Sequence, residues 1–88
     1  MKAFQLSDPN IIHFQNLERI PGDQELENLK REIQAAGGGI GKKKEAGLDD
    51  LYECSIKGMR FDIIFDGAEA TLYAPEKETI ERLMSMFV

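Results

Sequence analysis

The residues that most resemble a chemical site form a glycine-lysine run, Gly37-Gly38-Gly39-Ile40-Gly41-Lys42-Lys43-Lys44. A P-loop cradles phosphate with such a run, but it requires Gly where this chain has Ala36 and Ser or Thr where it has Lys43. The run also follows a predicted helix, whereas anion-binding loops lead into one. We therefore predict a flexible connector over residues 37–50. The alternative is a small ligand-binding or anion-binding domain, or an enzyme, that uses the Gly37–Lys44 loop through Lys42, Lys43 and Lys44.

The single His and the single Cys, His13 and Cys54, are the next candidates for chemistry. Cys54 falls between Tyr52 and Ile56 on a predicted inward face, where a thiol behaves as a small hydrophobic group. No residue near His13 in the sequence could orient it as an acid or base. The chain has no Cys/His cluster and no calcium-loop spacing, so we predict no catalytic residue, no metal and no cofactor. One Cys cannot form an internal disulfide, and we expect a cytoplasmic protein.

Two carboxylates, Glu53 and Asp62, face one another in the strand register predicted below. Such a pair could act in acid–base catalysis. Arg60 lies diagonal to Glu53, however, and like charges on a strand surface are tolerated when solvent or a nearby cation screens them. We therefore interpret the pair as part of a solvated strand face.

An alternating pattern over residues 51–74 predicts a three-strand antiparallel meander. Its strands are joined by a tight turn at Lys57-Gly58 and a two-residue turn at Gly67-Ala68. Both turns place the same side chains on one buried face, and a one-residue slip would turn the whole set to solvent. The predicted pairs on that face are Ile56 with Met59, Cys54 with Phe61, Tyr52 with Ile63, Phe65 with Ala70, Ile63 with Leu72 and Phe61 with Ala74.

Two amphipathic helices flank the meander. The first is predicted over residues 23–36, with Asp23 as its N-cap and Gly37 at its end. The second is predicted over residues 76–88, after Pro75. Their apolar stripes are Leu26, Leu29 and Ile33 in the first helix, and Ile80, Leu83, Met84 and Phe87 in the second.

Alternation over residues 1–7 and 11–16 predicts one or two N-terminal strands, with Ile12 and Phe14 inward in the second. Together these elements predict an α+β fold of two layers, an antiparallel sheet with both helices on one face. The order helix, meander, helix over residues 23–88 is similar in topology to the double-stranded-RNA-binding domain. That family carries a Lys cluster at the start of its last helix, where this chain has Pro75-Glu76-Lys77-Glu78. The likeness therefore does not lead us to predict RNA binding.

Length and charge narrow the functional classes further. The 88 residues fit one domain, residues 1–88. Eleven Lys and Arg against sixteen Asp and Glu give a net charge of −5, so no overall basic field attracts phosphate backbones or anionic lipid. The longest apolar run is three residues, whereas a membrane-spanning helix needs about 20. We predict no nucleic-acid partner and no membrane association.

The outward-pointing side chains of the meander carry the functional prediction. An apolar patch rimmed by charge is typical of a partner surface. Two interpretations stay open, namely contact with a partner and cover by the N-terminal strands or the 37–50 segment. We predict a non-enzymatic protein-protein interaction or self-association, through a sheet face or edge, and a particular version is an acidic neutraliser of a basic protein. The predicted contact residues are Leu51, Ile64, Thr71, Tyr73, Arg60 and Asp62.

Overall fold

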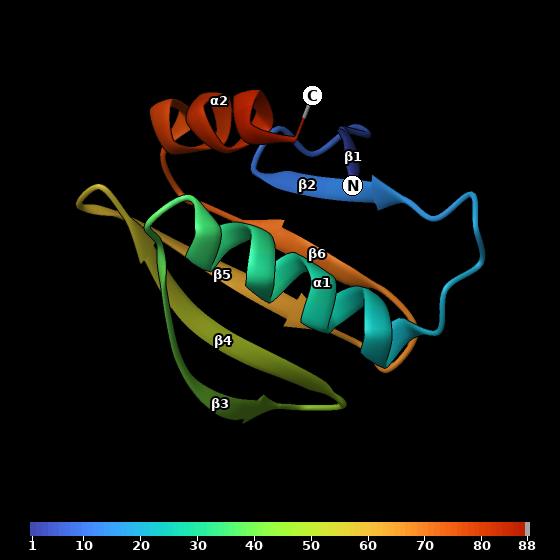
Figure 1. Cartoon of the computed structure of the whole chain (residues 1–88). Coiled ribbons are helices and arrows are strands. Elements are labelled where there is room, and N and C mark those ends of the chain that lie inside the picture. Colours follow the sequence, from blue (N-terminus) through green and yellow to red (C-terminus); the bar gives the residue numbers. More distant parts are fainter. Residues whose placement is uncertain (88) are drawn as a thin grey trace.

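Six strands and two helices make up the part of the chain that a computed structural model describes, residues 1–87. In chain order they are β1 (Lys2–Phe4), β2 (Ile11–Gln15), α1 (Gly22–Ala35), β3 (Gly39–Ala46), β4 (Asp49–Ile56), β5 (Met59–Phe65), β6 (Ala70–Tyr73) and α2 (Lys77–Met86). The strands form one antiparallel sheet in the order β1-β2-β6-β5-β4-β3, and the helices pack against it (Figure 1). The predicted α+β class is confirmed.

The predicted meander is present as β4, β5 and β6, with the predicted registers. Ile56 lies opposite Met59 at the first turn, and Phe65 lies opposite Ala70 at the second. In the first turn, Lys57-Gly58, both residues have positive φ angles of 50° and 80°. Two successive positive φ angles characterise the type I′ hairpin turn, whose twist matches that of the flanking strands. The turn chemistry and the alternating pattern therefore agree on the same register.

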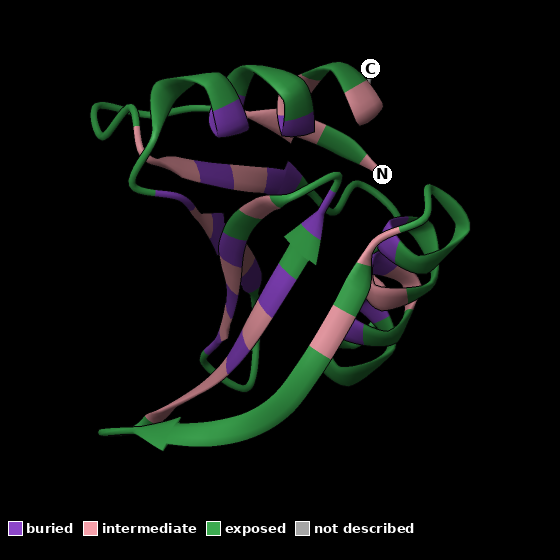
Figure 2. Cartoon of the chain, turned by 90° about the vertical axis from the view of Figure 1, so that its left-hand side faces the viewer, coloured by how far each residue is buried: buried purple, intermediate pink, exposed green. Residues whose placement is uncertain are grey.

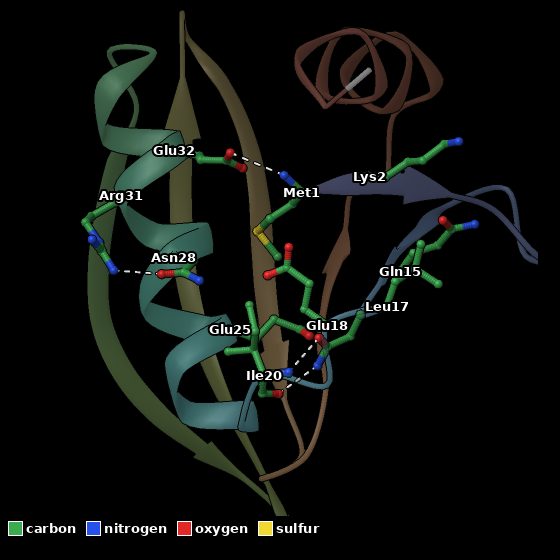
Figure 3. Close-up of a pocket in the computed structure, with 11 residues that line it drawn as sticks. Met1, Lys2, Gln15, Leu17, Glu18, Ile20, Glu25, Asn28, Arg31 and Glu32 are labelled. Carbon is green, nitrogen blue, oxygen red and sulfur yellow. Dashed lines mark hydrogen bonds and ion pairs between the residues drawn. The ribbon is translucent and has the colours of Figure 1, made fainter.

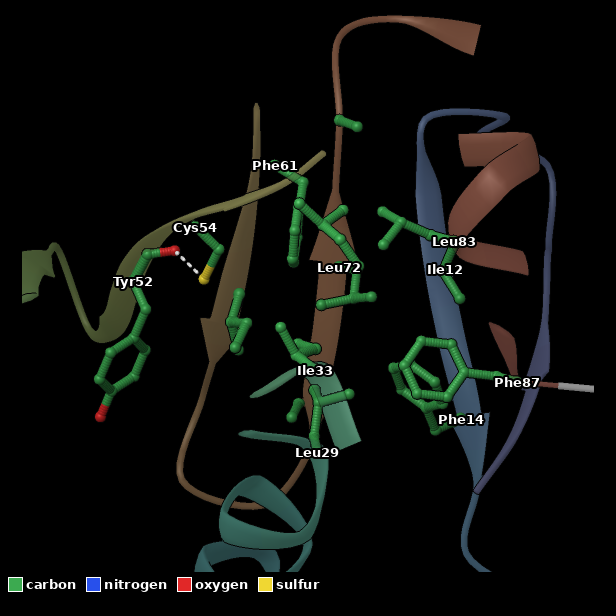
Figure 4. Packing of buried hydrophobic residues seen from close by; sticks show 14 of the residues in the cluster. Ile12, Phe14, Leu29, Ile33, Tyr52, Cys54, Phe61, Leu72, Leu83 and Phe87 are labelled. Carbon is green, nitrogen blue, oxygen red and sulfur yellow. Dashed lines mark hydrogen bonds between the residues drawn. The ribbon is translucent and has the colours of Figure 1, made fainter. Parts of the chain in front are cut away.

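One cluster of apolar side chains fills the space between the helices and the sheet (Figure 4). We call the sheet face that contributes to this cluster the inner face. Buried and partly exposed residues alternate along the strands of the meander (Figure 2). Inner-face Phe61 and Ile63 of β5 are 2% and 0% exposed. Phe14 of β2 meets Phe87, which follows α2, edge-on with ring centroids 5.0 Å apart. The helices contribute Leu26, Leu29, Ile33, Ile80, Leu83 and, at the end of α2, Phe87.

The predicted start of the first helix needs one adjustment. Asp23 is not the N-cap, because α1 already begins at Gly22 and the carbonyl of Pro21 accepts the first helical hydrogen bond, from the Glu25 N–H at 2.9 Å. Asp23 instead lies in the first turn, where its charge favours the positive end of the helix dipole. Gly37 has a φ of 89° and ends α1 as predicted. Position 88, in the predicted second helix, lies outside the described residues.

The largest difference from prediction is in residues 37–50. The predicted irregular connector is wrong in its secondary structure, because β3 occupies Gly39–Ala46 and pairs with β4. The register shifts between Ile40 and Lys43, which marks a β-bulge. A Cβ added to Gly41 would lie 2.5 Å from the carbonyl oxygen of Glu53, so glycine permits the close approach of the two strands there. The sheet consequently has one strand more on this side than the pattern predicts.

The N-terminal strands extend the other side of the sheet. β1 is shorter than the predicted strand over residues 1–7, and Leu6 beyond it is 64% exposed. Ile12 and Phe14 of β2 point inward as predicted, with exposed fractions of 0% and 9%. β2 pairs with β6 through Ile11 opposite Tyr73. The N-terminal hairpin therefore lies beside the meander within one sheet.

Candidate functional site

The predicted contact residues lie together on the sheet face that points away from the helices, here called the outer face. Ile64 of β5 pairs with Leu51 on one side and with Thr71 on the other. Tyr73 pairs with Asp62 in the same two strands. All five side chains are partly buried, because neighbours on the face cover one another. The alternation of buried and partly exposed residues along β4, β5 and β6 separates this face from the core.

Neither the N-terminal strands nor the 37–50 segment covers the outer face. The N-terminal strands pair with β6 at one edge of the sheet, and residues 39–46 pair with β4 at the other. Both segments thus widen the sheet, and neither folds across it. The buried stripes of α1 and α2 belong to the inner-face cluster. Within residues 1–87, the outer face is an open surface.

The N-terminal hairpin adds residues to this face that the sequence analysis did not assign to it. Ile11 lies opposite Tyr73, so it extends the apolar part of the outer face. We call Ile11, Tyr73, Ile64 and Leu51 the apolar row, in which Tyr73 and Ile64 are diagonal neighbours because Tyr73 pairs with Asp62 and Ile64 pairs with Thr71. Phe4 pairs with His13, and their rings stack with centroids 5.4 Å apart. His13 therefore has an aromatic neighbour from β1, nine positions away in the sequence. The alternation of β2 predicts that Ile11 and His13 point outward. Alternation within one strand does not reveal its partner, however, so it does not predict that β2 pairs with β6.

Charged residues border the apolar row across β3, β4 and β5. The Glu53 carboxylate binds the Lys44 ammonium, and its other oxygen lies 3.5 Å from Nη2 of Arg60. The hydrogen bond and charge of Lys44 hold the pKa of Glu53 below its ordinary value, and Arg60 adds to this effect. For Asp62, which pairs with Glu53, burial and repulsion by Glu53 raise the pKa above its ordinary value. The two facing carboxylates thus have pKa shifts of opposite sign.

A hollow of about 520 Å³ lies at one end of the outer face. Three of the predicted contact residues, Arg60, Asp62 and Tyr73, contribute to its wall. The rest of the wall comes from Met59 and Phe61 of β5, from Gly58 in the β4–β5 turn, and from residues around the start of α2, including Pro75 and Glu76. The outer face therefore joins a partly apolar surface to a concave, charged margin.

A second hollow, of about 470 Å³, lies between the N-terminus, the β2–α1 loop and α1 (Figure 3). Much of its polar lining is already paired, since the Met1 ammonium lies 3.4 Å from a Glu32 oxygen and Arg31 donates to Asn28 at 2.7 Å. Glu25 also lines it and is only 6% exposed. Burial raises the pKa of Glu25 above its ordinary value. None of the predicted contact residues lies in this hollow.

The glycine-lysine run does not form a phosphate cradle. Most of it lies in β3, where Lys43 and Lys44 pair with Tyr52 and Leu51 and therefore point to opposite faces of the sheet. Neither hollow is lined by Lys42, Lys43 or Lys44. The geometry thus gives no support to the alternative of a ligand-binding loop at Gly37–Lys44.

The other candidates for chemistry are placed apart from one another. Cys54 lies in the core, where burial raises the pKa of its thiol to about 11, and the thiol donates to the Tyr52 carbonyl at 3.4 Å. His13 lies on the outer face, so the sheet separates the two side chains. Among the described residues, no group of three or more His, Cys, Asp or Glu side chains could hold a metal ion. No helix within residues 1–87 has the length and apolar composition needed to cross a membrane.

Comparison of the chain with protein-family models, with curated proteins and with solved structures gave no match. The functional argument therefore depends on the geometry of the outer face and of the sheet edges.

Proposed function

We propose that this chain is a non-enzymatic protein-binding domain that self-associates through the outer face of its sheet. The observation that carries the proposal is the apolar row of Ile11, Tyr73, Ile64 and Leu51 on a face that no other described segment covers. Contiguous apolar surface rimmed by charge is the usual composition of a protein interface.

The charges that border the outer face are compatible with a second copy of the chain as its binding partner. The chain carries −5 overall, so two copies that met through acidic surfaces would repel each other. The part of the border formed by Lys44, Arg60, Glu53 and Asp62 is balanced instead, whereas Asp49 adds a negative charge at the other end of β4. Two such faces can meet about a two-fold axis, each apolar row against the other, with the balanced part of each border adding no net repulsion.

The size of the face is also sufficient. The molecule measures 29 × 28 × 27 Å along its principal axes, so one side of it projects roughly 800 Å². A stable interface takes roughly 800 Å² from each partner, and sheets commonly pack face to face. Most of the outer face would therefore take part in a dimer.

Sedimentation velocity over a concentration series tests this proposal. The wild type is expected to form a dimer as concentration rises, and Ile64→Asp is expected to remain monomeric because it would bury a carboxylate against the apolar row. Gln24→Asp is the matched control, since it adds the same charge on exposed α1 and should dimerise like the wild type. Circular dichroism verifies that each variant is folded, and Thr71→Lys replaces Ile64→Asp if the latter does not fold. A wild type that is monomeric up to roughly 1 mM, where binding is worth only about 4 kcal/mol, would contradict the proposal, and so would an Ile64→Asp dimer.

A further inference from the structure

The two edges of the sheet end in different ways. β1 has three residues, and its Ala3 N–H donates to the Phe87 carbonyl at 3.3 Å, so the end of α2 occupies part of that edge. β3 forms the opposite edge with eight residues. Within residues 1–87, its backbone makes no backbone hydrogen bond to any strand or loop except β4. Alternate N–H and C=O groups of β3 therefore point into solvent, and Figure 2 shows nearly the whole strand as exposed.

The free edge is also the most basic segment of an acidic chain. Lys44 pairs with Glu53 on the outer side of the sheet, whereas Lys42 and Lys43 form no ion pair within residues 1–87. Lys43 lies opposite Tyr52 on the inner side. There the Lys30 ammonium of α1 lies 4.2 Å from the centre of the Tyr52 ring. Cationic groups thus flank the edge on both faces of the sheet.

The lysines of β3 disfavour pairing with a second copy of the chain and favour pairing with an acidic segment. If a second copy paired antiparallel along the whole of β3, Lys42 would lie opposite Lys43, and like charges placed opposite one another destabilise strand pairing. Lysine on an edge strand is a known protection against such self-pairing. An extended segment with acidic side chains would instead meet Lys42 and Lys43, which form no ion pair within residues 1–87 and, as successive residues of a strand, point to different faces.

We propose that β3 is a docking edge for an extended segment of another protein that carries consecutive Asp or Glu residues. The segment adds to the sheet as a further strand, its backbone pairing with the free groups of β3 and its carboxylates lying beside Lys42 and Lys43. Strand addition of this kind uses main-chain hydrogen bonds for affinity and side-chain contacts for selection. This docking edge is separate from the apolar row of the outer face and does not require self-association.

A titration of the ¹⁵N-labelled full chain tests the proposal. The probe is a short peptide with blocked ends, in which consecutive Glu residues lie between Val and Thr residues. The matched control is a peptide of the same sequence in which the backbone amides that would face β3 are N-methylated. These are alternate amides of the peptide. The control keeps the charge of the probe but cannot pair with β3 as a strand. We expect the unmethylated peptide to slow hydrogen exchange at the outward-facing amides of β3, and the methylated peptide to have no such effect.

Protein variants show whether the lysines select the peptide. The double variant Lys42→Glu, Lys43→Glu should weaken peptide binding roughly tenfold, because exposed charge pairs contribute little each and reversal makes two of them repulsive. Lys77→Glu, an exposed Lys of α2, is the control and should bind like the wild type. Ile64→Asp should also bind normally, so loss of dimerisation and loss of peptide binding are separate results.

Three outcomes would overturn the docking edge. One is equal binding of the methylated peptide, which would show attraction to charge without strand addition. Another is unchanged amide exchange in β3 at peptide concentrations up to roughly 1 mM, where binding is worth only about 4 kcal/mol. The third is an oligonucleotide of the same charge that binds as tightly as the peptide, which would assign the lysines to general anion contact.

Discussion

Ile63 and Ile64 are adjacent in β5 and identical in side chain, yet they lie on opposite faces of the sheet. Ile63 is 0% exposed and belongs to the core beneath the helices. Ile64 is partly exposed and lies between Leu51 and Thr71 on the outer face. Ile63 is enclosed on all sides by the close-packed interior, whereas Ile64 leaves part of its surface in water. The comparison separates side chains that maintain the fold from side chains that remain available for contact.

The sharpest way to break this comparison is to truncate both residues. Ile63→Ala should lower the free energy of unfolding by about 2–5 kcal/mol, because it leaves a cavity in a close-packed core. Ile64→Ala should lower it by less than about 1 kcal/mol, since much less apolar area is returned to water. Urea denaturation, at concentrations below those of self-association, measures both changes. Equal losses would show that the outer face is part of the folding core.

The helix layer offers a second contrast, in which a carboxylate is buried. Burial raises the folded-state pKa of Glu25 above its ordinary value of 4.5, so the folded state holds this proton more tightly than the unfolded state. Stability is therefore lost as the pH rises from the ordinary value through the raised value. Glu25→Gln retains an acceptor for the Ala70 N–H and should increase the free energy of unfolding at pH 7 by up to about 1 kcal/mol. Unfolding curves at pH 4 and pH 7 test this, and a Gln variant that is less stable at pH 7 would refute it.

The smallest expected effect concerns the exposed carboxylate of the outer face. Lys44 and Arg60 lower the pKa of Glu53 below 4.5, so its pairing stabilises the fold above that value and the benefit is lost as the pH falls through the lowered value. Glu53→Gln should slightly reduce stability at neutral pH, less so in high salt. The same change should lower the pKa of Asp62 by removing repulsion. An NMR titration of Asp62 in both proteins measures this, and an unchanged or higher value would contradict the ion cluster.

The sequence predicts the meander well because its pattern contains two independent constraints. The Lys57-Gly58 turn sets one register, the second turn sets the other, and both bury Phe61 and Ile63. The cross-strand neighbours of the outer face follow from the same registers. The pattern alone thus predicts Ile64 beside Leu51 and Thr71, where the structure has it.

β3 was missed because its sequence lacks the pattern that identifies a half-buried strand. Ile40 is its only side chain that is even partly buried, and the bulge beside it breaks the alternation. Three consecutive lysines and the four glycines before them then indicate a loop. An edge strand held mainly by backbone pairing with β4 leaves little trace in hydrophobic periodicity. The pairing of β2 with β6 was missed for another reason, since contacts between distant segments are not encoded in local alternation.

The junction between β2 and β6 has a consequence for how the chain folds. Every other pair of neighbouring strands is consecutive along the chain, whereas this pair brings Ile11 to Tyr73. Its strand register has two residue pairs, extended by hydrogen bonds between Asn10 and Ala74, and closing so long a loop is entropically costly. The Phe14–Phe87 contact ties the same junction to the end of α2. We expect the four C-terminal strands to assemble first, with the amino-terminal hairpin docking last and being the first part to detach.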